Sequence, residues 1–387
     1  MSFTIKSDKR ILFEFFSRKA EAGDAEALSF VAECYQKGDG VEQDEKKAVE
    51  LLQRAVEMGC PRAMVNLGRY FESGICGIEE DERKAVEYYQ MAADLGNSNA
   101  MCNLGVCFEN GIGVEQNEEM AVQFYVRAVE LNNTQAMNNL GLCYRNGIGV
   151  KQDKKTAAEL FQRASEGGNG DATNNLGWCY EFGEGVQQDK MKALKLYQQA
   201  HEKGNKCGFD NVVKCYLTGV GIKQDGKKAI QFIEHAISVG NIQAMVTLAS
   251  LYENGVENHI KVDKNKAFEL YQRAVELENH EAMYRLGLLY ENGDESGIKK
   301  DKKKANELYQ RAVELGNPEA MFRLGLLFEN GDESGIKQDK KHFASINTPQ
   351  NWGIHKQCSV LHCAMAVVKA WSRTKRKQSN CINEHLT

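Results

Sequence analysis

Apolar and small residues recur at helical spacing along most of the chain. In residues 99–132, Leu104 and Phe108 follow Ala100 at i+4 and i+8, which places the three side chains on one face of a helix. Gly111 comes shortly afterwards and predicts the end of this helix, since glycine readily adopts the left-handed backbone of a C-cap. The stretch therefore predicts a first helix that ends in a glycine turn.

A second helix is predicted after a short loop. Ala121, Tyr125 and Ala128 are spaced i, i+4 and i+7, again on one face. Val114, in the loop, is expected to anchor the loop to the core. An Asp or Asn precedes each second helix, and its side-chain oxygen is expected to cap that helix, at about 1 kcal/mol each. These residues are Asp44, Asp81, Asn117, Asp153, Asp189, Asp225, Asp263, Asp301 and Asp339.

The helix pair is repeated along the chain with a period of 36–38 residues. Residues 282–303 and 320–341 are nearly identical copies, and looser copies precede them. A fixed period in this range predicts a solenoid, in which each helix pair covers apolar surface of the next. The expected fold class is all-α. The position that opens the first helix is occupied by Ala27, Ala63, Ala100, Ala136, Ala172, Gly208, Ala244, Ala282 and Ala320.

The repeated pattern resembles the Sel-one-like repeat, a relative of the tetratricopeptide repeat. It reads A-x-x-x-L-G-x-x-Y, then G-x-G-V-x-x-D, then K-A-x-x-x-Y-x-x-A, and it covers about residues 24–342. The resemblance implies a right-handed superhelix, an α-solenoid of antiparallel helix pairs. It also implies a scaffold that binds other proteins. Local departures occur in the sixth repeat, at Gly208 and Val213.

The ends of the chain differ from its middle. Residues 1–23 resemble a second helix without its first, so we expect a half-repeat cap. Residues 24–318 hold eight complete repeats, and residues 319–342 hold a ninth that is cut short. Residues 343–387 share no period with the rest and form an irregular tail, either functional or a by-product of splicing or a frameshift.

Charge and hydropathy argue against nucleic-acid and membrane binding. The net charge of −5 and the pI of about 6.0 leave no overall basic field for nucleic acid. No stretch approaches the ~20 apolar residues of a membrane-spanning helix. The first residues are charged and lack a long apolar run, which argues against a secretory signal. We expect a cytoplasmic protein.

Five of the twelve cysteines occupy one position of the repeat. Neighbouring helix pairs lie roughly 9–10 Å apart, whereas a disulfide needs Cα atoms within about 7 Å. The column is therefore expected to hold free thiols beside the core, which fits a reducing compartment. Its members are Cys34, Cys107, Cys143, Cys179 and Cys215.

The spacing of reactive side chains predicts no catalytic, cofactor or metal site, so we expect a non-catalytic protein. Alternatives lie in the tail. His355, Cys358, His362 and Cys363 cluster, but their spacing matches no standard zinc finger. Residues 373–377 form a basic cluster of the kind that directs nuclear import.

Two further alternatives concern function. Ser372-x-x-Lys375 fits the serine β-lactamase motif without its supporting K-T-G, and cysteine-rich bacterial members of the resembling family have been associated with β-lactam binding. The other alternative is a lumenal adaptor in protein quality control. A glycan at the glycosylation sequon of Asn132 would support this alternative.

The first helix of the repeat carries a glycine in its L-G pair, Gly105 in residues 99–132, which we call the repeat glycine. The candidate binding residues form a column two residues before this position. Helical geometry turns the column well away from the core face, so we expect it to be exposed. An amide offers a donor and an acceptor, and one rung every ~10 Å matches about three residues of an extended peptide. The alternative is that asparagine is simply the polar consensus residue of the repeat. The column reads Phe30, Asn66, Asn103, Asn139, Asn175, Asn211, Thr247, Arg285 and Arg323.

Two further features refine the predicted ligand. Arg285 and Arg323, beside Tyr284 and Phe322, suit an acidic or C-terminal carboxylate group. A mostly acidic column four residues after the glycine is expected to be solvated surface or to favour basic side chains. We therefore predict an extended peptide of a partner protein along the concave surface lined by the first helices. The acidic column contains Glu72, Glu109, Glu181, Glu253, Glu291 and Glu329.

Overall fold

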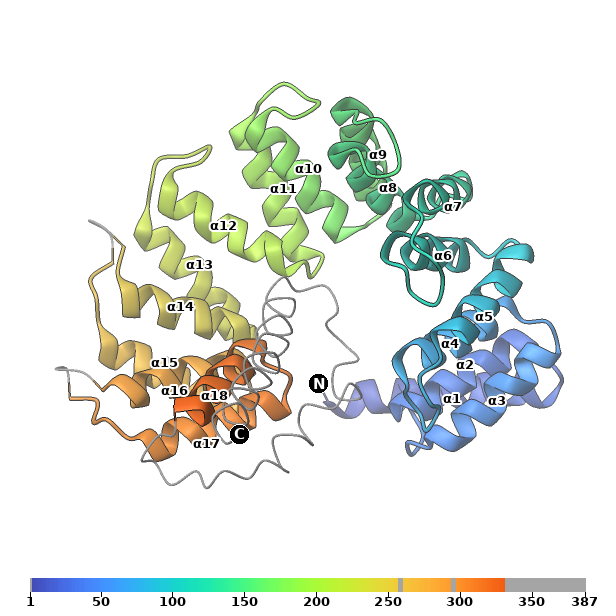
Figure 1. Cartoon of the computed structure of the whole chain (residues 1–387), viewed down its shortest axis with the longest axis horizontal. Helices are drawn as coiled ribbons and strands as arrows, with labels where there is room; N and C mark the ends of the chain where they lie inside the picture. Colours follow the sequence, from blue (N-terminus) through green and yellow to red (C-terminus); the bar gives the residue numbers. More distant parts are fainter. Residues whose placement is uncertain (1, 257–259, 294–296, 331–387) are drawn as a thin grey trace, which may run out of the picture. The chain divides into compact units, whose positions relative to one another are not determined.

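The computed structural model describes residues 2–256, 260–293 and 297–330. These residues form 18 helices and no strand, and an isolated antiparallel bridge joins Val256 to Ile260. Every helix after the first is 13 residues long, as expected when one structural unit is repeated (Figure 1). The all-α repeat fold predicted from the periodicity is confirmed.

First and second helices alternate along the chain after α1, which spans Ser2–Glu21. The first helices are α2 (Ala25–Lys37), α4 (Pro61–Ser73), α6 (Ser98–Asn110), α8 (Thr134–Asn146), α10 (Gly170–Phe182), α12 (Lys206–Thr218), α14 (Ile242–Asn254), α16 (His280–Asn292) and α18 (Pro318–Asn330). The second helices are α3 (Glu45–Glu57), α5 (Glu82–Asp94), α7 (Glu118–Glu130), α9 (Lys154–Glu166), α11 (Lys190–Glu202), α13 (Gly226–Ser238), α15 (Lys264–Glu276) and α17 (Lys302–Glu314).

The chain divides into two compact units, which are described separately. The first holds Met1–Cys215 and Gly219–Lys223, and the second holds Tyr216–Thr218 and the residues from Gln224 onward. In the first unit, α2 packs on α3, α3 on α4, and so on to α11, and the first helices α2 and α4 also touch. In the second unit the same order of contacts runs from α13 to α18. Each helix pair is thus covered by the next pair within its unit.

The predicted caps of the second helices are confirmed wherever the structure describes them. The carboxylate of Asp44, for example, accepts a hydrogen bond of 2.9 Å from the backbone N–H of Lys47. Equivalent bonds cap α5, α7, α9, α11, α13, α15 and α17. Asp339 lies outside the described residues.

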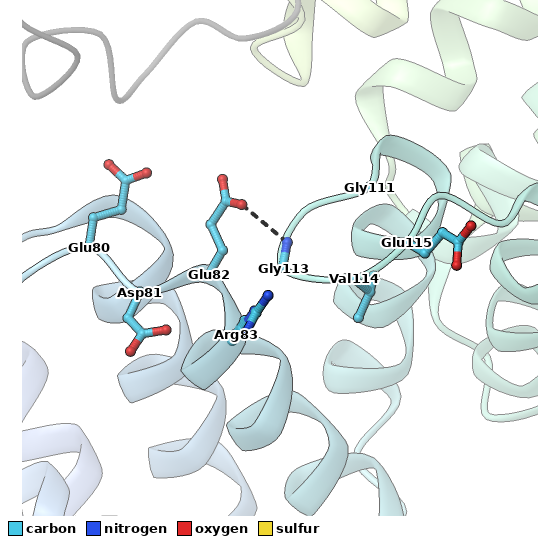
Figure 2. Close-up of a pocket in the computed structure, with 8 residues that line it drawn as sticks. All are labelled: Glu80, Asp81, Glu82, Arg83, Gly111, Gly113, Val114 and Glu115. Carbon is cyan, nitrogen blue, oxygen red and sulfur yellow. Dashed lines mark hydrogen bonds between the residues drawn. The ribbon is translucent and has the colours of Figure 1, made fainter.

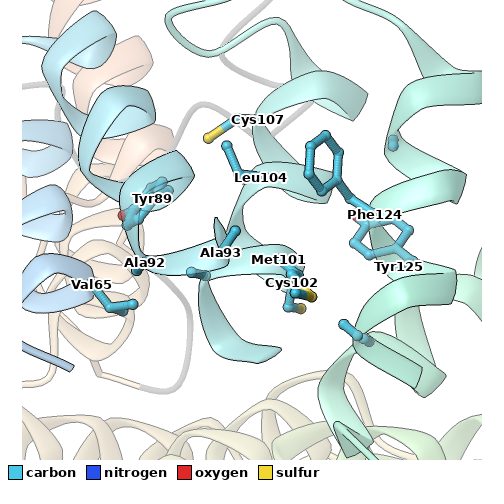
Figure 3. Close-up of a cluster of buried hydrophobic side chains, with 14 of the residues drawn as sticks. Val65, Tyr89, Ala92, Ala93, Met101, Cys102, Leu104, Cys107, Phe124 and Tyr125 are labelled. Carbon is cyan, nitrogen blue, oxygen red and sulfur yellow. The ribbon is translucent and has the colours of Figure 1, made fainter. Parts of the chain in front are cut away.

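The core is built from one small set of positions that recurs in each repeat. Figure 3 shows Tyr89 and Tyr125 from two successive second helices on either side of α6, with Leu104 and Cys107 between them. All four side chains are at most 1 % exposed. The apolar cluster continues from repeat to repeat, so stacking buries surface that a single helix pair would leave open.

The cysteine column lies in this core, as predicted. Cys34, Cys107, Cys143, Cys179 and Cys215 are all buried. All nine cysteines within the described part of the chain are unpaired thiols.

At the N-terminus, α1 contacts the first full repeat as a second helix does. The left-handed Gly40 has no room for a Cβ because the backbone of Lys9 lies against it. Gly113 meets Glu82 at the start of α5 in the same way. The helix spans Ser2–Glu21, within the predicted cap at residues 1–23.

None of the helices in residues 2–330 is long and apolar enough to span a membrane. The irregular tail, with its histidine and cysteine cluster, its basic cluster and the pair Ser372 and Lys375, lies outside the described residues.

Candidate protein-binding surface

The asparagine column of the first helices is half-buried rather than exposed. Asn66, Asn103, Asn139, Asn175 and Asn211 all have intermediate exposure. Helical geometry alone points this position away from its own core face, but the first helix of the preceding repeat lies beside it and covers its flank. The expectation of full exposure was therefore wrong, because it treated each helix pair in isolation.

The covered side of the column forms hydrogen bonds between repeats. The Nδ2 of Asn175 donates to Oδ1 of Asn138 at 2.9 Å, and that of Asn211 donates to Oδ1 of Asn174 at 2.8 Å. Asn66 donates to Glu33 Oε1 at 2.9 Å. These side chains therefore help hold neighbouring repeats in register.

Asn139 makes the weakest of these contacts. Its Nδ2 lies 3.8 Å from the sulfur of Cys102, a poor acceptor, and its Oδ1 accepts from Gln135 at 3.2 Å. Its amide is thus engaged at both ends by described residues.

Asn103 differs from the other four asparagines. The residue that faces it from the preceding repeat, at the place of Asn138 and Asn174, is Val65, which offers no side-chain acceptor. Among the described residues, no hydrogen-bond partner exists for the Asn103 amide. The repeat that carries Asn103 therefore presents an amide whose donor and acceptor are both available.

The amide oxygens of the column remain available even where the nitrogens are used. Within the described residues, nothing donates to the Oδ1 of Asn66, Asn103, Asn175 or Asn211. The first helices from α4 to α12 consequently carry a row of half-buried acceptors, one per repeat except at Asn139. A backbone N–H is the complementary donor.

The arginines that continue the column in the second unit are neutralised locally. Arg285 Nε donates to Glu281 at 2.8 Å, and Arg323 binds both carboxylate oxygens of Glu291, at 2.6 and 3.0 Å. Arg323 also joins the ninth repeat to the eighth. Each arginine thus has a carboxylate partner within the protein, which weakens the case for an acidic ligand group at these positions.

The described glutamates of the acidic column are buried or half-buried and accept hydrogen bonds from tyrosines, so they are not simply solvated surface. Tyr125 donates to Glu109 at 2.6 Å, and Tyr197 donates to Glu181 at 2.7 Å, with Glu181 only 5 % exposed. The same bond joins Tyr89 to Glu72, Tyr271 to Glu253, and Tyr309 to Glu291. The carboxylates link the two helices of one repeat, which corrects the prediction made from their charge. Glu329 lies beyond the described side chains.

The loops between the helices form a hollow of about 570 Å³, and it is lined mostly by acidic residues. Figure 2 shows Glu80 and Asp81 just before α5 and Glu82 at its start, with the carboxylate of Glu82 directed toward Gly113 in the loop of the next repeat, where Glu115 also lies. The carboxylate of Glu82 accepts the N–H of Gly113 at 3.1 Å. The N–H of Gly113 already donates to a carboxylate, and the neighbouring acids would repel a phosphate group.

A second set of asparagines was missed by sequence reasoning. Asn133 Oδ1 accepts from the N–H of Ala136 and caps α8, while its Nδ2 donates to Asn99 of the preceding repeat at 2.8 Å. Asn169, Asn205 and Asn279 act in the same two ways. The signal was an Asp or Asn three residues before most of the alanines that open the first helices.

Comparison with known families decides the identity of the repeat. The model of the Sel1 repeat matches nine consecutive segments, at residues 25–60, 61–97, 98–133, 134–169, 170–205, 208–241, 242–279, 280–317 and 318–342. The chain belongs to the Sel1 repeat family. Proteins of this family are commonly protein-interaction scaffolds.

A solved structure has the same fold. The crystal structure of c5321, a protective antigen of uropathogenic Escherichia coli with an SLR fold, is 28 % identical over 86 % of this chain and 70 % of that chain, with a TM-score of 0.52. A Sel1 repeat protein from Oxalobacter formigenes is 23 % identical over 81 % of this chain and 89 % of its own, with a TM-score of 0.47. No curated protein sequence matches the chain.

A cysteine-rich bacterial protein is also among the similar structures, but it does not support the β-lactam alternative. Helicobacter pylori cysteine-rich protein B is 28 % identical but covers only 33 % of this chain and 92 % of its own, with a TM-score of 0.28. A likeness this limited carries no functional argument. Within the described residues, no group of three or more His, Cys, Asp or Glu is placed to hold a metal ion.

Proposed function

We propose that this Sel1 repeat protein is a non-catalytic scaffold that binds an extended segment of a partner protein along the first helices of its first unit, the helices that line the concave surface in related repeats. The observation that carries the proposal is the row of half-buried amide oxygens at Asn66, Asn103, Asn175 and Asn211, for which the described residues supply no donor. A half-buried acceptor gains more from a hydrogen bond than an exposed one, because water solvates it less.

The geometry of an extended peptide suits this row. Successive rungs of a helical-repeat column lie roughly 10 Å apart, which corresponds to about three residues at ~3.3 Å each. A peptide backbone can therefore donate one N–H to each available rung, with two residues between neighbouring rungs and no bond at Asn139, whose oxygen is already used. Asn103, whose amide is free at both ends, is the rung at which the peptide backbone both donates and accepts.

The first test is affinity capture from a lysate of the cells that express the protein, followed by mass spectrometry. The wild type is compared with the single variant Asn103→Ala and the triple variant Asn103→Ala, Asn175→Ala and Asn211→Ala. Each lost peptide hydrogen bond is expected to cost about 1 kcal/mol, or roughly fivefold in affinity. Asn103→Ala breaks no bond within the described protein, so loss of partners from this variant reports binding and not stability.

A matched control uses asparagines outside the column. Asn110 and Asn254 are exposed at the ends of first helices, and each donates only within its own helix, to Val106 and Ser250. The variant Asn110→Ala, Asn254→Ala should retain every partner. Partners that survive the triple substitution in a folded protein would contradict binding along the asparagine column.

We also propose the cytoplasm as its compartment. Support comes from the unpaired thiols of the cysteine column, which persist where glutathione keeps thiols reduced. Fractionation of the source cells tests this directly.

A further inference from the structure

Three departures from the repeat pattern meet on the first helices of the fourth and fifth repeats. Arg145 stands at a position where five other described repeats carry the tyrosine-bonded glutamate. Trp178 is the only tryptophan at the position after the repeat glycine. Phe182 occupies a position that is polar in the other eight repeats: Lys37, Ser73, Asn110, Asn146, Thr218, Asn254, Asn292 and Asn330.

The three side chains form one contiguous stack. The guanidinium carbon of Arg145 lies 5.0 Å from the centroid of the Trp178 ring, and that ring lies 4.9 Å from the ring of Phe182. Phe182 is 50 % exposed although it is apolar. The Nε of Arg145 donates to Oδ1 of Asn146 at 3.4 Å, and the other N–H groups of its guanidinium have no acceptor among the described side chains.

The stack borders a hollow of about 490 Å³ between α8 and α10. Arg145, Trp178, Asn174 and Asn175 line it, together with the pair Lys154 and Glu184. Lys154 is bonded to Glu184 at 2.8 Å, and Lys214, beside Phe182, is bonded to Glu181 at 3.0 Å. Arg145 has no carboxylate partner among the described residues. One unneutralised positive charge therefore remains beside an exposed aromatic surface.

We propose that this hollow is a specificity pocket for an acidic side chain, Asp or Glu, of the partner peptide, followed by an apolar side chain that packs on Trp178 and Phe182. The inference rests on the proposed peptide-binding function and assigns its sequence preference. One carboxylate balances one guanidinium in a charge-assisted hydrogen bond. A polyanion such as RNA would bring more negative charges than the one unpaired guanidinium balances, so the charge pattern favours a peptide.

The test uses the full chain and a random dodecapeptide phage library as the probe. Selection is expected to enrich Asp or Glu next to an aromatic or aliphatic residue. A fluorescein-labelled peptide of the enriched sequence is then titrated by fluorescence anisotropy. Arg145→Gln should weaken its binding about tenfold or more, and replacing the acidic residue of the peptide should have an equivalent effect.

The chain offers a matched control and a variant designed to fold. Arg127 lies 5.3 Å from the Phe124 ring on a second helix, so Arg127→Gln removes a similar arginine–aromatic contact elsewhere and should change binding by less than about twofold. Arg145→Glu with Phe161→Tyr installs the glutamate–tyrosine pair of the neighbouring repeats. This variant should fold as the wild type does and should lose the peptide.

The results of these experiments distinguish a failure of the proposed pocket from a failure of the proposed peptide-binding function. Peptides that bind independently of Arg145 but are lost with Asn103→Ala would overturn the pocket and leave the proposed function standing. A selection that enriches no peptide would overturn both. A labelled oligouridine that binds through Arg145 where the peptide does not would overturn the assignment to an acidic peptide.

Discussion

The hydroxyl of Tyr125 donates a 2.6 Å hydrogen bond to the carboxylate of Glu109, and this bond joins the two helices of the third repeat. The tyrosine is fully buried, and burial together with the carboxylate raises the pKa of its hydroxyl far above the ordinary value. The bond is charge-assisted and therefore stronger than a neutral one.

The glutamate and the tyrosine of this bond are either both present or both absent in each of the eight complete repeats. Where the glutamate is replaced, the second helix carries a residue without a hydroxyl: Gln36 with Leu52, Arg145 with Phe161, and Leu217 with Ile233. A buried tyrosine hydroxyl without an acceptor costs free energy, so loss of one partner favours loss of the other. The pair is thus part of the architecture of the repeat.

Removing the hydroxyl should destabilise the protein. Tyr125→Phe is expected to lower the free energy of unfolding by about 1.5–3 kcal/mol, the range for hydrogen bonds to charged groups. A double-mutant cycle with Glu109→Gln, followed by urea denaturation, should give a coupling of about 1 kcal/mol or more.

Tyr144→Phe is the control for this cycle. The Tyr144 hydroxyl has no hydrogen-bond partner among the described residues, so its removal should change stability by less than about 0.5 kcal/mol. Equal effects of the two substitutions would show that the bond to Glu109 contributes nothing specific.

The repeat glycine makes room for the same tyrosine ring. A Cβ on Gly105 would collide with Tyr125, so Gly105→Ala should destabilise by about 1–3 kcal/mol although alanine favours the helix. The first repeat offers the compensating pair, since Ala32 occurs there with Leu52. Gly105→Ala with Tyr125→Leu should therefore cost less than the sum of the single substitutions, as measured by thermal or urea unfolding. Strict additivity would exclude steric coupling at this position.

Gly113, the second glycine of the loop between the two helices, should tolerate replacement by alanine less well than Gly96, whose Cβ would meet no other atom. Gly113 has φ 66°, and the backbone of Glu82 fills the place of a Cβ, so Gly113→Ala should cost about 2–5 kcal/mol from strain and collision together. Gly96 has φ 81° with no atom within 4 Å of a Cβ, so Gly96→Ala should cost only about 1–2 kcal/mol. Circular dichroism melts of the two variants make the comparison, and equal costs would mean that the contact between repeats is not tight.

The elements of each repeat could be predicted because their signals are local. Asp44 precedes a helix face by a fixed distance, and its capping bond forms within the next three residues. Gly111 ends α6 in the left-handed conformation expected of it. Such features depend on one helix and its ends, which the sequence displays directly.

The candidate site was predicted less well because its chemistry lies between repeats. The partner of Asn175 is Asn138, 37 residues earlier, and the absence of a partner for Asn103 depends on Val65. Charge alone also misled, since Glu181 looks like a surface acid but is buried against Tyr197. The partners of the asparagines and the burial of Glu181 both depend on which side chain of a neighbouring helix faces each residue. Only the packing of the helices shows this.

The buried cysteine column should make stability fall at high pH. Burial, with a smaller effect of nearby carboxylates, raises the pKa of Cys107 and Cys143 to about 12, from an ordinary value of 9.0. Between these values the unfolded chain has lost thiol protons that the folded protein keeps, so the free energy of unfolding decreases as pH rises above about 9. From pH 8 to 10 the two cysteines together should account for a loss of about 2–3 kcal/mol. Urea denaturation under reducing conditions should show a correspondingly shallower pH dependence for Cys107→Ala, Cys143→Ala, whereas Cys207→Ala, at an exposed position, should follow the wild type. A wild-type slope retained by the double variant would place the alkaline sensitivity elsewhere, for instance in the buried tyrosines.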